Sequence, residues 1–190
     1  MPLNLPIVLT WIRVGMIPLF VAIFYLPAGW LDLSDRNLVA TVIFTAAAVT
    51  DWLDGYLARR WNQTSAFGAF LDPVADKLIV AAALIVLVDL TRVDPILAFI
   101  IIGREITISA LREWMAKVGE TKSVAVNALG KIKTVSQLVA IPMLLYHDRI
   151  GSLDPQRLGT WLIWAAAVLT LLSMFYYLKL AAHAFKRNAA

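Results

Sequence analysis

Residues 51–76 read DWLDGYLARRWNQTSAFGAFLDPVAD and carry four aspartates in a chain that is otherwise poor in charge. The aspartates are Asp51, Asp54, Asp72 and Asp76, and the stretch joins the end of one apolar segment to the start of the next. An ionised group at the centre of a membrane helix costs ~2.5–3.5 kcal/mol on insertion scales. Four of them at such a junction point to a membrane protein with a functional acidic site.

The composition of the whole chain supports this interpretation. Of its 190 residues, 61% are hydrophobic and 16% are charged, whereas a soluble domain is ~45–50% apolar and ~25% charged. Such a chain cannot cover itself with polar surface, so a soluble globular monomer is excluded, and so is intrinsic disorder. The absence of cysteine excludes disulfides, thiol catalysis and zinc–cysteine sites.

Six apolar segments are candidates for membrane-spanning helices, each of which needs ~20 mostly apolar residues. They lie at about residues 5–26, 38–58, 70–88, 95–115, 132–146 and 158–180. The connections are brief, so the sequence predicts an all-α polytopic membrane protein, a bundle of six transmembrane helices with antiparallel neighbours, in one domain over residues 1–190. The first segment has no basic region before it and contains Arg13, so we expect a retained helix and not a signal peptide.

Lysine and arginine set the orientation of a membrane protein, because they accumulate in its cytoplasmic loops. If the chain crosses the membrane six times, thirteen of the lysines and arginines lie on one side of it, in loops or at helix ends. The other side holds Arg36, Arg92, Arg149 and Arg157. We therefore expect both termini and the acidic site to face the cytoplasm. The net charge of +4 reflects this topology, and the cytoplasmic cations have too few aromatic neighbours to indicate a nucleic-acid partner.

Two interpretations fit the four aspartates. Arginines can neutralise them as structural ion pairs, which is credible for one pair. We favour cation binding, because four negative charges on two adjacent helices repel each other in a low-dielectric setting. Carboxylates suit hard ions such as Mg²⁺, Mn²⁺ or Ca²⁺. Four of them balance two divalent ions, and two ions ~3.5–4 Å apart can clamp both oxygens of a phosphoryl displacement.

Helical spacing gathers these residues on shared faces, because residues three and four apart are neighbours on a helix. One stripe contains Asp51, Asp54, Gly55 and Ala58. Asp72 and Asp76 lie one turn apart on the next helix, and Gly68 joins them if that helix begins early enough. Pro73 fits best in a first turn, which would leave Gly68 in the preceding loop. The small residues either admit a ligand to the backbone or serve helix packing.

The stretch resembles the signature of the CDP-alcohol phosphotransferase family, D-x-x-D-G-x-x-A-R, eight residues, then G-x-x-x-D-x-x-x-D. All its fixed positions are present: Asp51, Asp54, Gly55, Ala58, Arg59, Gly68, Asp72 and Asp76. A chance match has a probability on the order of 10⁻¹⁰ per starting position. Residues 4–13, 104–114 and 130–134 are similar to bacterial members of the family that make phosphatidylglycerol phosphate.

The resemblance implies a six-helix enzyme of the bacterial cytoplasmic membrane, usually a homodimer. It would transfer the phosphatidyl group from CDP-diacylglycerol to sn-glycerol 3-phosphate and release CMP. By similarity, the four aspartates hold two divalent ions, Mg²⁺ or Mn²⁺, and Asp76 is also the general base. The set implied for the cytidine diphosphate portion is Gly55, Ala58, Arg59, Ser65 and Gly68. For Arg59 a cytoplasmic anchor, and for Ser65 a helix cap, are the alternatives.

The phosphate of the acceptor needs cations of its own. Arg104 and Arg112 lie two turns apart on the fourth helix, and Lys131 and Lys133 begin the fifth. We predict that both arginines and one or both lysines bind this phosphate, because arginine forms forked bonds with phosphate oxygens. The alternatives are a surface charge for Arg112 and a solvated loop for the lysines. Thr10, Arg13 and Ser109 are weaker candidates, and Glu105 can orient an arginine.

Two functions of other classes stay open at this point. A divalent-cation transporter would also place aspartates in a bundle, but near the midplane and with a path to both faces. A structural subunit would have no activity alone and would tolerate the loss of Asp76. Within the family, inositol phosphate, serine, inositol or another phosphatidyl lipid are alternative acceptors, and a cationic pocket favours a phosphorylated one.

Overall fold

The computed structural model describes residues 5–27, 29–61, 66–117 and 128–188, and only the backbone at 5–7, 54–55, 57–59, 61, 66–69, 128–131, 180 and 183–188. Regular structure within these ranges is helical, as the sequence predicts. The helices are α1 Leu5–Ala22, the short 3-10 helix η1 Ile23–Tyr25, α2 Leu33–Trp61, α3 Ala66–Asp89, α4 Pro95–Lys117, α5 Ala128–Tyr146 and α6 Pro155–Asn188.

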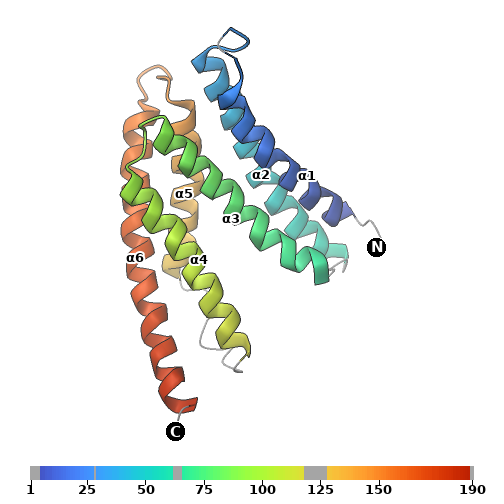
Figure 1. Cartoon of the computed structure of the whole chain (residues 1–190), viewed down its shortest axis with the longest axis vertical. Coiled ribbons are helices and arrows are strands. Elements are labelled where there is room, and N and C mark those ends of the chain that lie inside the picture. Colours follow the sequence, from blue (N-terminus) through green and yellow to red (C-terminus); the bar gives the residue numbers. More distant parts are fainter. Residues whose placement is uncertain (1–4, 28, 62–65, 118–127, 189–190) are drawn as a thin grey trace.

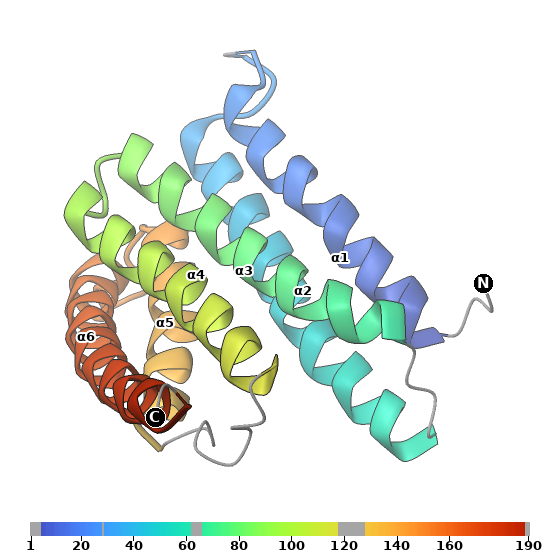
Figure 2. The ribbon, with the colours of Figure 1, turned by 60° about the horizontal axis from the view of Figure 1, so that its bottom comes forward.

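The α-helices alternate in direction along the chain. In Figure 1 the connections from α1 to α2, α3 to α4 and α5 to α6 lie in the upper half. The last described turns of α2 lie at the right, near the beginning of α1, and the ends of α4 and α6 lie lower down. Helix packing follows a closed order in which α1 contacts α2, α2 contacts α5, α5 contacts α6, α6 contacts α4, α4 contacts α3 and α3 returns to α1. Figure 2 shows this arrangement from the lower end.

The core of this ring is apolar. Phe44 on α2, Leu84 on α3 and Ile141 on α5 are among the buried residues of one continuous cluster. The outward faces are also apolar: Trp161 and Phe99 are each 76% exposed. Large apolar surface on the outside as well as the inside is what a helix bundle needs when its surroundings are lipid.

Two described helices are long and apolar enough to cross a membrane, at Val8–Tyr25 and Pro155–Lys179, and a shorter apolar helix covers Ile132–Tyr146. The other predicted spans carry more charge in their helices, including the acidic and basic groups of the site. The all-α prediction is therefore confirmed, whereas the count of six spans stays a prediction.

The third helix begins earlier than Pro73 favours. It starts at Ala66, so Pro73 lies inside it and the backbone of Gly68 is helical. The placement of Gly68 in a preceding loop is therefore wrong. An internal proline lacks the N–H that would bond one turn back, and α3 continues through this interruption to Asp89.

Arg92 lies in the connection between α3 and α4 and binds residues of α2 and α5. It donates hydrogen bonds to the carbonyl oxygens of Leu144 at 3.0 Å and Leu145 at 2.8 Å, and to Oδ1 of Asn37 at 3.0 Å. The last carbonyls of a helix have no partner within it, and Arg92 supplies one for α5. Burial lowers the pKa of Arg92, an effect that nearby Asp148 opposes.

We expect Arg92→Ala to lower the free energy of unfolding by about 1–3 kcal/mol, because it leaves buried carbonyl groups unpaired. Thermal unfolding in detergent measures this. The matched control is Arg157→Ala, whose side chain is 80% exposed and pairs with Asp154 at 3.4 Å. An exposed pair of this kind contributes about 0–1 kcal/mol. Equal losses in the two variants would contradict the capping role.

Candidate active site

Arg13 of α1 forms ion pairs with two of the predicted metal ligands, Asp51 and Asp76. Its side chain is fully buried, and its Nη1 lies 3.0 Å from Oδ1 of Asp51 and 3.0 Å from Oδ1 of Asp76. The two oxygens share one nitrogen, so they cannot be farther apart than twice that distance. Carboxylates from α2 and α3 thus converge. A cation buried in an apolar helix needs acidic partners, and Arg13 finds them in this pair.

Thr10 holds a third aspartate. Its hydroxyl donates a hydrogen bond of 2.6 Å to Oδ1 of Asp72. Thr10 and Arg13 are three residues apart and share one face of α1, just as Asp72 and Asp76 share one face of α3. The face of α1 therefore contacts the acidic face of α3 over a full turn. Thr10 and Arg13 are weak candidates in the sequence, and the structure places both against predicted metal ligands.

In the described part of the structure, Arg13 brings one positive charge to the two carboxylates of Asp51 and Asp76. One guanidinium faces Asp51 and Asp76, whose side chains are 42% and 43% exposed. An ion pair is therefore present, as the structural interpretation expects, but it neutralises one charge. Oxygen donors with exposed edges fit a hard divalent cation. Among the described side chains, no group of three or more histidine, cysteine or acidic residues is arranged to hold a metal ion, and the bimetallic site stays a prediction.

Several predicted site residues have side chains outside the described part of the structure. They are Asp54, Gly55, Ala58, Arg59, Ser65, Gly68 and Lys131. The backbone positions of all except Ser65 fall within the bounds of α2, α3 or α5. Their roles in binding metal, cytidine diphosphate or acceptor stay predictions.

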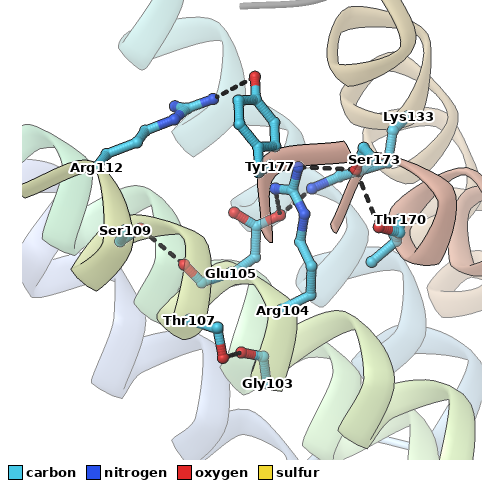
Figure 3. A network of polar contacts seen from close by, with 10 residues as sticks. All are labelled: Gly103, Arg104, Glu105, Thr107, Ser109, Arg112, Lys133, Thr170, Ser173 and Tyr177. Atoms are coloured by element: carbon cyan, nitrogen blue, oxygen red, sulfur yellow. Dashed lines mark hydrogen bonds and ion pairs between the residues drawn. The ribbon is translucent and has the colours of Figure 1, made fainter. Parts of the chain in front are cut away.

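A second cluster is centred on Glu105 of α4 (Figure 3). Its Oε1 pairs with Lys133 of α5 and lies 3.4 Å from Nη1 of Arg104. Both cations are buried, Arg104 at 6% and Lys133 at 2% exposure. The solvated-loop alternative is therefore wrong for Lys133. Glu105 orients both a lysine and an arginine, which extends its expected role.

Residues of α6 complete this cluster, and no sequence pattern indicates them. Ser173 accepts a hydrogen bond of 2.9 Å from Nη2 of Arg104 and donates one to the carbonyl of Thr170. Nη2 of Arg112 donates to the hydroxyl of Tyr177 at 3.2 Å, and its guanidinium lies 5.2 Å from the centre of that ring. Arg112 is therefore packed against α6 and is not a simple surface charge.

The structure therefore brings together some of the cations that are predicted to bind the acceptor. Arg104 and Lys133 meet at Glu105, and Arg112 lies on the other side of the Tyr177 ring from Arg104 in Figure 3. Three positive groups and one carboxylate leave a net charge of two, which suits a phosphate monoester carrying about two negative charges. Ser109 instead donates to the carbonyl of Glu105 within α4, at 2.7 Å.

One cavity extends from Arg13, Asp51 and Asp76 to Glu105. It has a volume of about 260 Å³ and is bounded by five of the six α-helices. Its polar lining consists of Arg13, Asp51, Asp76, Lys77, Glu105, Thr134 and Gln137. Glu105 belongs both to this lining and to the second cluster, which we call the cationic cluster because it contains Arg104, Arg112 and Lys133. The described side chains of Arg104, Arg112 and Lys133 are not among the lining residues, so the cationic cluster meets this space through Glu105. Sequence spacing alone did not indicate Lys77, Thr134 or Gln137.

An apolar groove of about 200 Å³ adjoins this cavity between α2 and α5. Phe44, Ala48 and Leu138 line both spaces. The groove continues along Val49 and the exposed Trp52. A cavity with charged groups in its wall and an apolar groove beside it suits a ligand that has a charged head and a hydrocarbon tail.

Comparison with known proteins agrees with this chemistry. The sequence profile of the CDP-alcohol phosphatidyltransferase family matches residues 3–172. The chain is also similar to proteins of Escherichia coli, Salmonella typhi and Shigella flexneri that are each named CDP-diacylglycerol–glycerol-3-phosphate 3-phosphatidyltransferase. Each is 49% identical over 183 residues, which cover 95% of this chain and 96% of the relative.

Proposed function

The chain belongs to the CDP-alcohol phosphatidyltransferase family, and from this premise we propose that it transfers the phosphatidyl group of CDP-diacylglycerol to sn-glycerol 3-phosphate. The products are phosphatidylglycerol phosphate and CMP. The observation that carries this proposal is the shared cavity, which brings carboxylates from α2 and α3 together with Glu105, the centre of the cationic cluster. Both a pyrophosphate and a phosphorylated alcohol can be bound at such a site.

The reaction is an in-line displacement at phosphorus. The primary hydroxyl oxygen of the acceptor forms a bond with the phosphorus that bears the diacylglycerol, and the bond from that phosphorus to the CMP oxygen breaks. Asp76 accepts the hydroxyl proton, since its carboxylate lines the cavity and is 43% exposed. Arg13 keeps Asp76 oriented through its bond of 3.0 Å.

Asp51, Asp54, Asp72 and Asp76 would hold two divalent ions, Mg²⁺ or Mn²⁺. When bound, these ions supply electrostatic stabilisation of the charge that develops on the phosphoryl oxygens. Thr10 restricts Asp72 to one orientation through the bond of 2.6 Å. The predicted nucleotide contacts of Gly55, Ala58, Arg59, Ser65 and Gly68 complete the donor end of the site.

The membrane placement follows from the same residues. We propose six spans in the bacterial cytoplasmic membrane, one domain over the whole chain, and a homodimer as the working unit. The termini and the site face the cytoplasm, because the lysine- and arginine-rich helix ends share that side. A water-soluble acceptor then reaches the cavity from the cytoplasm while the lipid donor stays in the bilayer.

The apolar groove between α2 and α5 is the proposed seat of an acyl chain. We expect Ala48→Phe, which fills the shared wall of the groove and the cavity, to raise the KM for CDP-diacylglycerol about tenfold, because overpacking costs about 1–3 kcal/mol. The KM for sn-glycerol 3-phosphate should stay the same. Val42→Phe is the matched control on α2, since Val42 is exposed and lines neither space. An unchanged KM for the lipid would remove the groove from the donor site.

The experiment that tests the whole proposal follows CMP release by the purified protein in lipid nanodiscs. CDP-diacylglycerol is offered with glycerol 3-phosphate, inositol phosphate, inositol or serine, with Mg²⁺ or Mn²⁺ present. We expect the fastest release with glycerol 3-phosphate, none after chelation by EDTA, and recovery when either ion is added back. Preference for another acceptor would correct the substrate, and no CMP with any acceptor would contradict the proposal.

A further inference from the structure

Gln137 of α5 has a buried polar group that no part of the described protein satisfies. Its side chain is 5% exposed, and the amide nitrogen Nε2 is buried without a hydrogen-bond partner among the described residues. Leaving a buried donor unpaired costs about 1–3 kcal/mol. A bound ligand, an ion or a water molecule can supply the missing acceptor of such a group.

The place of Gln137 indicates which ligand this is. Gln137 lines the central cavity together with Asp76 and Glu105. It also follows Lys133 by one helical turn, so the two side chains leave α5 from one face. Gln137 therefore shares the cavity wall with the proposed base, Asp76, and with Glu105, the partner of Arg104 and Lys133.

The polar groups of glycerol 3-phosphate can be assigned in turn. The phosphate is anionic and is matched by the cations around Glu105, and the primary hydroxyl that attacks is matched by Asp76. The secondary hydroxyl is the remaining polar group. It is uncharged and can accept a hydrogen bond, which suits a neutral amide N–H better than another arginine or lysine.

We propose that Gln137 donates a hydrogen bond to the secondary hydroxyl of the acceptor and thereby selects glycerol phosphate over phosphorylated alcohols that lack this group. This inference rests on the proposed function and adds a specificity-determining residue to it. An acceptor without the hydroxyl leaves Nε2 unpaired in the complex as well, and a site built to bond a hydroxyl discriminates strongly against analogues that lack it.

The test compares two acceptors in two proteins. Gln137→Met keeps the length of the side chain and removes both polar atoms. With sn-glycerol 3-phosphate, kcat/KM should fall about tenfold, as expected for one lost hydrogen bond. With 3-hydroxypropyl phosphate, which lacks the secondary hydroxyl, the variant and the wild type should have equal kcat/KM. Gln156→Met is the matched control, since Gln156 is exposed and lies at the start of α6.

The other outcomes are distinct. Equal losses with both acceptors, or a raised KM for CDP-diacylglycerol alone, would overturn the proposal and assign Gln137 to the fold or to the donor site. Thermal unfolding identifies a folding defect, and Gln137→Asn, which withdraws the amide by one methylene, then provides the same comparison. Wild-type protein that releases no CMP with either acceptor would contradict the proposed function itself, before any variant is made.

Discussion

Asp76→Asn is expected to lower kcat for CMP release by about 10³-fold or more, because loss of a general base alone costs 10²–10⁴-fold. The change is nearly isosteric, but the amide is neutral and does not accept the proton of the attacking hydroxyl. It also weakens the charge-assisted bond to Arg13, which now measures 3.0 Å. The measurement is kcat with both substrates saturating, so that weaker binding does not account for the loss.

The control for Asp76→Asn lies on the same helix. Asp89→Asn makes the same chemical change at the other end of α3, where the side chain is exposed, and should leave kcat at the wild-type value. Thermal unfolding of both variants separates chemistry from folding. If Asp76→Asn keeps most of its activity while folded, Asp76 is not the general base.

The sequence predicts the helical framework well because its strongest signal is local. Apolar runs of the required length mark the helices, and the structure places α1, α4 and the end of α5 close to the expected bounds. The beginning of α3 is mispredicted, because Pro73 carries a local preference for a first turn. Helix α3 nevertheless starts at Ala66. Packing against α1, α2 and α4 overrides the preference of a single residue.

The candidate site likewise has a part that the sequence predicts and a part that only the structure reveals. The spacing of the aspartates was readable because it depends on one helix at a time. The contacts of Arg13 with Asp76, of Arg104 with Ser173 and of Arg112 with Tyr177 join residues more than sixty positions apart. No periodicity encodes such pairs. The burial cost of Arg13 did signal that acidic partners exist, but only the folded ring identifies them.

Arg104 is the residue whose replacement should most affect binding of the acceptor. Arg104→Ala is expected to raise the KM for sn-glycerol 3-phosphate roughly 10- to 100-fold, because each hydrogen bond to a charged group contributes about 1.5–3 kcal/mol. The KM for CDP-diacylglycerol should stay the same. Arg104→Lys should give an intermediate KM, since it keeps the charge and loses the planar fork.

Arg104 is a cleaner probe of this site than Lys133 or Glu105. When Arg104 is replaced, Glu105 keeps its pair with Lys133, so no buried charge is left without a partner. Replacing Glu105 instead would leave two buried cations together, which is destabilising by about 3–5 kcal/mol and would confuse binding with folding. Steady-state kinetics against each substrate give the two KM values. If Arg104→Ala raises the KM for the lipid and not that for glycerol 3-phosphate, the cations around Glu105 bind the pyrophosphate of the donor. The assignment of donor and acceptor to the two clusters must then be reversed.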